Sequence, residues 1–355
     1  LFNINEIFNI PSYGHVMKKY LTNESQDASE IKTLIWKSST TDIRDSKIPD
    51  FNYLPIREKP VYYTQDGRAI ILDPVFFSEK MTVGPLFLLS KEVRDTAFTW
   101  FGKAFEDYVC NILNRMFPDL SQATIKRVNR NILCVDEEKN EFEIDACLND
   151  VTEVIFFETK TGFLREDKIL NEDYEVFVNH LRDKYVQSVK GNKGIGQLAK
   201  IVKTLASRKW LGENQEFKEA QKIYPVLIVQ DTFLNAPVYG EFFASEFLQL
   251  LDIDSFPSNG QFLIGNLVVA LPIIITIDDL ENLETSIEHF GFREMLSDYS
   301  KTCPDRIVSL HNFIASSSYN KKMYHNKSIA GSTMEIVNKS KKAFFPDAPD
   351  FEFPS

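Results

Sequence analysis

Hydrophobic and polar residues alternate along residues 141–160, and this period of two predicts a pair of β-strands joined by a short polar turn. In the first strand the alternation is expected to place four apolar side chains on one face: Phe142, Ile144, Ala146 and Leu148. Asp145 should then face the other way. The second strand is rich in β-branched and aromatic residues, and it is expected to carry Glu158 and Lys160 on one face and Thr159 on the other. Antiparallel pairing of these strands would bring Asp145 and Glu158 together, and two carboxylates at a strand end suit a hard cation such as Mg²⁺.

The flanking sequence shows further strand and helix patterns. Two apolar runs around Asp66 and Gly67 predict a β-hairpin within residues 59–77. An apolar stripe at helical spacing, closed by Pro118, predicts a long helix over 93–117. The remaining patterns predict strands over 122–135, 223–231 and 267–277, and helices over 174–208, 241–251 and from 278 to about 316. At the start of the last helical stretch, Asp278 and Asp279 are expected to be capping residues.

The composition is that of a globular protein of about two domains, with 355 residues, 43% hydrophobic and 26% charged. No apolar run reaches the roughly 18 residues that cross a bilayer, so no membrane association is expected. The four cysteines are scattered without a C-x-x-C pair, and they are expected to be buried free thiols of a cytoplasmic protein: Cys110, Cys134, Cys147 and Cys303. Because the chain begins at Leu1 rather than at Met, a segment ahead of it stays open.

The net charge of −11 is the wrong sign for general attraction to nucleic acid, so any polyanion must meet a local basic surface. One stretch offers such a surface, because residues 184–209 carry seven basic side chains and no acidic one. Its centre, GNKGIGQ, combines glycines with a helix start, which is a natural phosphate site. We expect a phosphate-binding face that carries Lys190, Lys193, Lys200 and Lys203. The alternative is a solvated helix face.

Glu106 adjoins the apolar stripe of the helix over 93–117, within one turn of Val109. It is therefore placed to approach the sheet rather than to point straight into water. The alternative is that Glu106 and Asp107 are ordinary surface acids of the helix. The downstream carboxylates, Asp145 and Glu158, favour the functional interpretation.

Five chemically distinctive residues follow one another on a helix, two adjacent strands and a second helix: Glu106, Asp145, Glu158, Lys160 and Gln197. This succession resembles the αβββαβ core of the PD-(D/E)XK (restriction-endonuclease-like) nuclease superfamily, and the resemblance covers residues 96–232. Gly102 and Glu106 match the Gly-x-x-x-Glu element of that superfamily. The chain departs from the RecB-like branch and its Gln-x-x-x-Tyr, because Ile201 stands four residues after Gln197.

The resemblance implies an α/β (α+β) fold with a mixed central sheet flanked by helices. Three regions are expected. Residues 1–95 form an N-terminal accessory region with the β-hairpin, residues 96–290 form the nuclease-like domain, and residues 291–355 form a C-terminal helical extension and tail.

The resemblance also implies metal-dependent hydrolysis of phosphodiester bonds. Asp145, Glu158 and the Thr159 carbonyl would hold Mg²⁺ or Mn²⁺, with a contribution from Glu106. Lys160 would orient the attacking water, and Gln197 would contact the active site or the DNA. DNA is favoured over RNA. The hairpin and the stretch FGKAFEDYV also resemble the front of bacterial nuclease-like proteins found in phage-defence settings, and this second resemblance implies a role as the effector of a bacterial anti-phage defence system. A protein partner in such a system, a homo-oligomer, an RNA-directed nuclease and an inactive nucleic-acid-binding or scaffold protein on the same fold stay open.

Overall fold

The computed structural model describes residues 91–119, 127–136, 138–150, 152–162, 173–189, 191–207 and 219–323, with shorter stretches elsewhere. The chain forms two compact units. One comprises Thr99–Ser332, and the other comprises Leu1–Phe98 with Thr333–Ser355. The predicted division into three regions stays a prediction, although the first unit extends well past residue 290.

The smaller unit contains the predicted hairpin. Strands β2 (Val61–Tyr63) and β3 (Ala69–Ile71) pair in antiparallel fashion, with Tyr63 opposite Ala69, which confirms the two strands. The expected turn at Asp66 and Gly67 lies outside the described residues. A third short strand, β1 (Ser25–Gln26), pairs with β2 in parallel.

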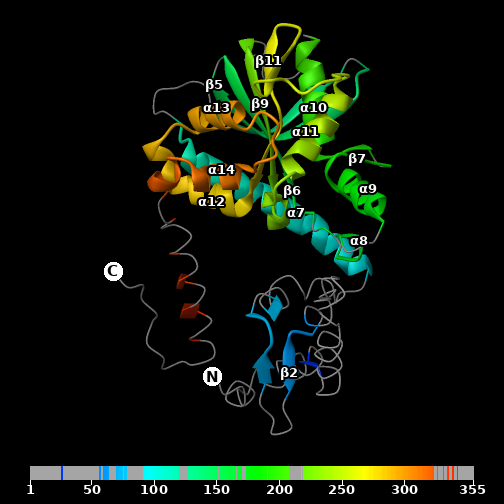
Figure 1. Cartoon of the computed structure of the whole chain (residues 1–355), viewed down its shortest axis with the longest axis vertical. Coiled ribbons are helices and arrows are strands. Elements are labelled where there is room, and N and C mark those ends of the chain that lie inside the picture. The colour runs from blue at the N-terminus through cyan, green and yellow to red at the C-terminus, as the bar shows by residue number, and fades with distance from the viewer. Residues whose placement is uncertain are drawn as a thin grey trace, which may run out of the picture. The chain divides into compact units, whose positions relative to one another are not determined.

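The larger unit is built on a seven-stranded mixed sheet (Figure 1). Its strands are β4 (Val128–Val135), β5 (Glu141–Asp150), β6 (Glu153–Lys160), β9 (Lys222–Val229), β10 (Gln261–Ile264), β11 (Leu267–Ala270) and β12 (Ile273–Thr276). Strands β4, β5 and β6 form an antiparallel meander, and β9 lies parallel to β6. Both β11 and β12 are parallel to β9, and β10 closes the sheet antiparallel to β11. A mixed α/β fold with a central sheet is therefore confirmed.

The predicted strand over 267–277 is two strands, because the chain leaves the ladder at Leu271 and Pro272. Proline has no N–H to donate, and the Leu271 N–H turns instead to the Gly260 carbonyl at 2.9 Å. The freed carbonyls of Leu271 and Pro272 accept hydrogen bonds from the buried guanidinium of Arg306, at 3.0 and 3.2 Å. Burial lowers the pKa of Arg306, and these carbonyls with the Tyr299 ring, 4.8 Å away, compensate the buried cation.

Helices cover both faces of the sheet. The principal ones are α7 (Lys91–Met116), α9 (Tyr174–Tyr185), α10 (Gly194–Ala206), α11 (Tyr239–Leu250), α12 (Ile277–Ser286), α13 (Phe292–Thr302) and α14 (Leu310–Ser316). Shorter elements are α8 (Glu166–Ile169), the β7–β8 hairpin (Gln187–Ser188 and Gly191–Asn192), and the 3₁₀ turns η3 (Thr232–Asn235), η4 (Ile287–His289) and η5 (Asn320–Lys322). One buried cluster joins α7, α12, α13 and α14 to one sheet face, and another joins α9, α10 and α11 to the opposite face. Figure 1 shows α10 and α11 on one flank and α12 and α14 on the other.

The cap of α12 differs from the expected one. Thr276 is the N-cap residue, and its hydroxyl accepts the Asp279 N–H at 3.4 Å. Asp278 and Asp279 lie in the first turn instead of at the cap, so the predicted capping role is wrong. The Thr276 hydroxyl in turn donates to the Asp279 carboxylate at 2.8 Å, so the cap residue and the first turn are also joined by their side chains.

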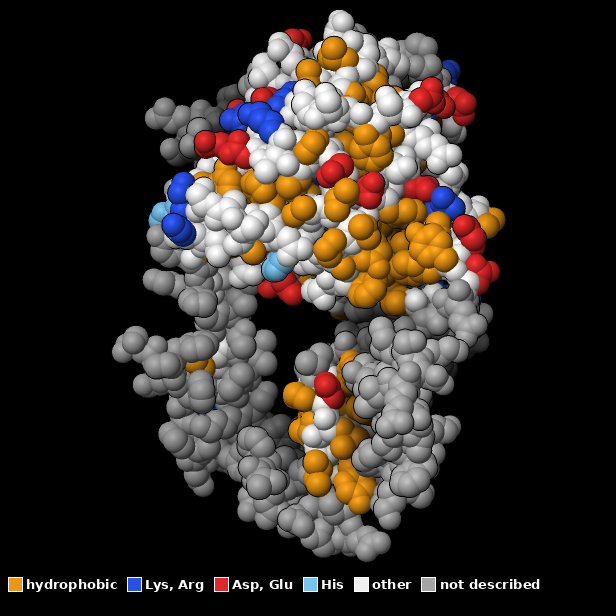
Figure 2. Space-filling model, viewed as in Figure 1, with side chains coloured by type: hydrophobic (Ala, Val, Ile, Leu, Met, Phe, Trp, Pro, Cys, Tyr) orange, Lys and Arg blue, Asp and Glu red, His pale blue; other side chains and the backbone are white. Residues whose placement is uncertain are grey.

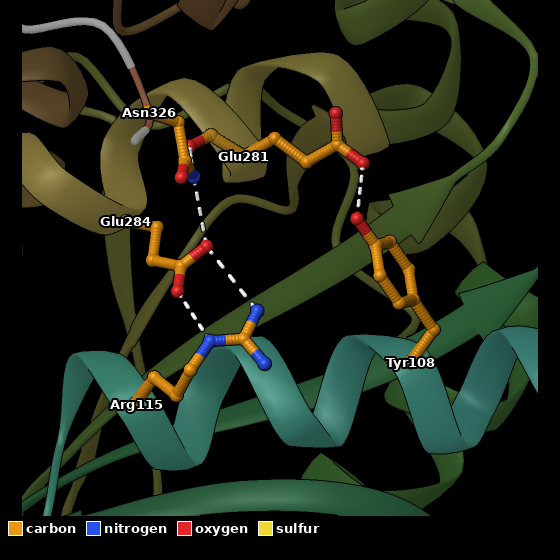
Figure 3. Close-up of polar contacts among 5 residues, drawn as sticks. All are labelled: Tyr108, Arg115, Glu281, Glu284 and Asn326. Carbon is orange, nitrogen blue, oxygen red and sulfur yellow. Dashed lines mark hydrogen bonds and ion pairs between the residues drawn. The ribbon is translucent and has the colours of Figure 1, made fainter. Parts of the chain in front are cut away.

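Polar contacts connect α7 to α12 (Figure 3). The Tyr108 hydroxyl donates to Glu281 at 2.6 Å, and Arg115 pairs with the buried carboxylate of Glu284. Asn326 donates to the same carboxylate at 2.8 Å. Burial opposes the ionisation of Glu284, but the hydrogen bonds from Arg115 and Asn326 outweigh it and lower its pKa. These contacts fix the rotation of α7 about its axis, and hence the face of α7 that meets the sheet.

Replacing glycine by alanine should change the stability of the protein in opposite directions at two helical positions. A Cβ on Gly196 of α10 would lie 2.3 Å from the Val186 carbonyl oxygen, whereas one on Gly102 of α7 would meet Thr161 Oγ1 at an ordinary 3.7 Å. We expect Gly196→Ala to destabilise the protein by roughly 1–3 kcal/mol through overpacking. Gly102→Ala should stabilise it by about 0.5–1 kcal/mol, because helical glycine costs backbone entropy. Thermal denaturation of both variants measures the signs, and equal stability of Gly196→Ala and the unchanged protein would contradict the packing argument.

Candidate functional site

The site lies where β5 and β6 separate. Their ladder runs from Asp150 opposite Glu153 to Ala146 opposite Phe157. Beyond that pair, the Asp145 carboxylate accepts hydrogen bonds from the Thr159 N–H at 2.7 Å and from the Thr159 hydroxyl at 2.9 Å. A side chain thus replaces the main-chain acceptor, and it ties the end of β6 to β5 while the two backbones diverge.

The alternation of β5 side chains between the two faces of the sheet is interrupted at Asp145. Ala146 and Leu148 pack in the cluster with α7, whereas Ile144 packs in the cluster with α10. The expectation of a single apolar face along this strand is therefore wrong. Asp145 and the facing Asn131 of β4 lie between the register pairs, and Asn131 has a φ of 50°, a left-handed conformation that asparagine tolerates. The change of face places an irregular backbone directly at Asp145.

Glu158 is a fully buried carboxylate, with 0% of its surface exposed. Its Oε1 is paired with Lys160 Nζ, and the same ammonium donates to the Thr159 carbonyl at 2.9 Å. Its Oε2 is also buried, and no residue in the described part of the chain donates to it. The ammonium therefore contacts two of the oxygens that the sequence assigned to Mg²⁺, and one buried oxygen is left unsatisfied.

Three carboxylates lie within electrostatic range of this one ammonium, and one of them, Glu158, is paired with it. Burial raises the pKa of Glu158 to about 8; Lys160 opposes the shift and Asp145 adds to it. Burial and Asp145 also raise the pKa of Glu106, against the effect of Lys160. Burial alone would lower the pKa of Lys160, but Glu158, Asp145 and Glu106 together raise it, so the ammonium stays charged. The site has more negative than positive charge to accommodate.

Glu106 reaches the site from α7 and is half-buried. The preceding turn of the helix lies against the end of β6, since the Cβ position of Gly102 is 3.7 Å from Thr161 Oγ1. Asp107 has a different role, because it pairs with Arg130 of β4. The structure thus brings Glu106, Asp145 and Lys160 within electrostatic range of one another.

The residues predicted to contact nucleic acid have other partners, or none that is described. Gln197 lies half-buried in the first turn of α10, and no hydrogen bond of its side chain is found among the described residues. Lys200 pairs with Asp136 at 2.8 Å and lies 4.6 Å from the centre of the Phe142 ring, and Lys203 pairs with Asp252 at 3.1 Å. Acids distant in sequence therefore neutralise two of the expected phosphate contacts. Lys193 precedes α10 without a described ion pair, and Lys190 lies outside the described residues.

The glycines of GNKGIGQ also have a packing role. Gly194 has a φ of 26°, and a Cβ there would lie 2.8 Å from the Tyr185 carbonyl oxygen. Together with the close approach at Gly196, this places the first turn of α10 directly on the end of α9. In Figure 2, the Lys and Arg side chains among the coloured residues are scattered beside acidic ones instead of forming a continuous basic patch.

Two residues that directly follow β9, Gln230 and Asp231, lie at the same edge of the sheet as Lys160, and they were not predicted from the sequence. The Gln230 N–H donates to the Lys160 carbonyl at 3.2 Å, and its buried Oε1 has no partner in the described regions. The Asp231 carboxylate accepts from Leu164 at 2.9 Å and from Phe233 at 3.1 Å, which ties the segment after β6 to η3. Their position directly after a buried parallel strand was the available signal, because ligands bind at the carboxyl ends of such strands.

Among the described residues, no three His, Cys, Asp or Glu side chains are close enough together to form a metal-binding group. In the same part of the chain, the helices lack the combined length and hydrophobicity that a bilayer crossing requires.

No family model matches the chain, and no curated protein is significantly similar to it.

Removing Lys160 should expose the electrostatic cost of the buried Glu158 carboxylate. Above about pH 8, where Glu158 is ionised, we expect Lys160→Met to destabilise the metal-free protein by roughly 2–4 kcal/mol, because the buried carboxylate then loses its ion partner or must take up a proton. The value lies below that of a fully buried pair, since Lys160 keeps 21% of its side chain exposed. Glu158→Gln with Lys160→Met should recover most of the loss, because the neutral amide needs no counter-charge. Thermal denaturation in EDTA measures this cycle, and additive losses would contradict the coupling.

Proposed function

We propose that this protein is a metal-dependent nuclease that hydrolyses phosphodiester bonds, with DNA as its substrate. The observation that carries the proposal is the buried Glu158, whose carboxylate has one oxygen on Lys160 and one without a partner. The order α7, β4, β5, β6, α10, β9 also supports it, because this is the order that the PD-(D/E)XK resemblance implies.

The donor types suit a hard divalent cation, although the three carboxylates do not yet form a metal-binding group in the metal-free arrangement of the described residues. Mg²⁺ and Mn²⁺ prefer carboxylate and carbonyl oxygens, and the site offers Asp145, Glu158 and the Thr159 carbonyl, with Glu106 beside them. The unsatisfied Glu158 Oε2 and the neighbouring carboxylates favour the entry of a cation, which would displace the proton that the raised pKa of Glu158 retains below about pH 8. A bound divalent ion would act as a Lewis acid and stabilise the charge that develops on the phosphate.

The side chains of the chain itself would supply position and charge. Thr159 holds the Asp145 carboxylate by two hydrogen bonds, so one ligand is preorganised before any cation binds. Lys160 is a charged donor at the same strand end, and on release from Glu158 its ammonium can reach a phosphate oxygen or the attacking water. The contacts between α7 and α12 keep Glu106 directed at the site.

Conservative changes at the site should abolish cleavage without unfolding the protein. We expect Asp145→Asn, Glu158→Gln and Lys160→Met each to reduce cleavage by about 10²-fold or more, with losses that do not add because the residues serve one site. The assay offers plasmid, linear duplex, single-stranded DNA and RNA with Mg²⁺, Mn²⁺ or EDTA. Glu141→Gln, an exposed acid on the same strand as Asp145, is the matched control and should cleave normally.

A binding measurement separates the metal from the reaction. Mg²⁺ or Mn²⁺ should raise the melting temperature of the unchanged protein, and it should do so much less for Glu158→Gln. Cleavage that persists in Glu158→Gln would place the activity elsewhere. Binding of DNA without any cleavage would instead support a catalytically inactive binding protein.

The basic stretch over 184–209 should contribute unequally to binding. Lys200 and Lys203 already pair with Asp136 and Asp252. Their replacement by glutamine should therefore change the counterion release on DNA binding very little. We expect Lys193→Gln to weaken DNA binding and to reduce the salt slope by about 0.9, the value for one phosphate contact. Lys203→Gln is the matched control, and its slope should stay unchanged. A slope that changes only in Lys203→Gln would move the binding face to the other end of α10.

A further inference from the structure

A second polar cluster lies on the same edge of the sheet as Lys160. Strands β6, β9 and β12 are parallel, so their carboxyl ends meet at one edge. Lys160 at the end of β6 and Thr276 at the end of β12 are both register partners of Val229. Two strand spacings therefore separate them, roughly 10 Å.

Asp279 is the centre of this cluster. It is 5% exposed, and both of its carboxylate oxygens are engaged. One accepts the Thr276 hydroxyl at 2.8 Å, and the other lies 2.7 Å from Nδ1 of His311. Asn235 of η3 supports the arrangement by donating to the Thr276 hydroxyl at 3.0 Å. Within the described residues, the His311 ring is the only basic group that contacts this buried carboxylate.

His311 has its second ring nitrogen available. Its side chain is 52% exposed, and no partner of Nε2 is found in the part of the chain that the structure describes. A buried carboxylate on Nδ1 fixes the orientation of the imidazole, and the protonated ring then presents an Nε2–H donor to solvent. A histidine that only fastened α14 to α12 would not need this exposure, because buried Leu310, Phe313 and Ile314 already anchor α14.

We infer that His311 contacts the phosphate backbone of the bound nucleic acid, and that Asp279 is its positioning residue. This inference rests on the proposed nuclease function. A separation of roughly 10 Å along the sheet edge is about one to two phosphate spacings along one duplex strand, so both groups can contact the same strand. The cleaved phosphate would lie at Lys160, and His311 would hold a phosphate farther along the same strand.

The contact depends on a hydrogen on Nε2 of His311. Asp279 and Asp278 of α12 interact with the ring. Apart from His311 itself, α14, η3 and β12 carry no charged side chain, and η5, which also packs against α14, carries Lys321 and Lys322. Only the protonated imidazole carries a second N–H for an anionic oxygen, so the contribution of His311 to binding should grow as the pH falls.

The test measures binding of a fluorescent DNA duplex by anisotropy, in the full chain carrying Glu158→Gln so that the duplex stays intact. We expect His311→Ala to weaken binding about ten-fold at pH 6 and less at pH 8, with a salt slope lower by about 0.9. His311→Lys, with its permanent charge, should retain binding at both pH values. Asp279→Asn should weaken binding, and it should add nothing in the His311→Ala background, because it acts through the ring. His289→Ala, which removes another exposed histidine, is the control and should bind normally.

The outcomes separate this inference from the proposed function. If the unchanged chain cleaves DNA but His311→Ala binds with unchanged affinity and salt slope at both pH values, the inference is overturned and the nuclease proposal stands. If His289→Ala loses as much affinity as His311→Ala, the contact is not specific and the inference is also overturned. A chain that neither binds nor cleaves nucleic acid would overturn both. Melting temperatures of all variants show whether a loss reflects unfolding.

Discussion

The structure depends on one electrostatic constraint, the burial of the Glu158 carboxylate at the end of an apolar strand. A carboxylate removed from water is costly unless a cation or hydrogen-bond donors compensate it. Here a single ammonium compensates one oxygen, and the other oxygen stays unsatisfied among the described residues. Protein interiors seldom keep such a group without a reason. An additional cation at this place would satisfy the free oxygen and offset the charge of the neighbouring carboxylates.

The fold supplies this constraint through the geometry of its strand ends. Strands β5 and β6 separate after Ala146 and Phe157, so the side chains that follow can gather around a space instead of continuing the ladder. Parallel β9 continues beside β6 as far as Lys160 and Val229, and its next residue donates to the Lys160 carbonyl. Helix α7 closes the other side of the site, and the contacts of Tyr108 and Arg115 with α12 fix the rotation of α7 about its own axis. The carboxylates thus come from three separate elements whose relative positions are fixed by apolar packing and by hydrogen bonds.

Much of this arrangement was predictable from the sequence, because period-two and helical patterns locate β5, β6, β9 and α7 to within a few residues. Local patterns also predicted that Glu106, Asp145, Glu158 and Lys160 would come together.

The features that these patterns missed depend on contacts between distant segments. The pairing of Lys200 with Asp136 and of Lys203 with Asp252 joins residues about 50 or more positions apart, so an acid-free stretch of sequence did not mean an unpaired surface. The change of face at Asp145 depends on the left-handed backbone of Asn131 in the neighbouring strand. The break at Pro272 depends on Arg306, which satisfies the freed carbonyls.

The ammonium of Lys160 lies where the proposed divalent ion would bind. Its ammonium contacts Glu158 and the Thr159 carbonyl, which are also oxygens that a divalent ion would use. Under the proposed function the two cations would compete for the same donors, and a divalent ion with its greater charge would have the stronger electrostatic attraction to three carboxylates. An ammonium displaced from Glu158 stays tethered to the same strand end, beside any anion that the divalent ion attracts. One lysine can then compensate the buried carboxylate in the metal-free protein and interact with the substrate in the loaded one. The stability of the empty site and the chemistry of the filled site would thus depend on the same side chain.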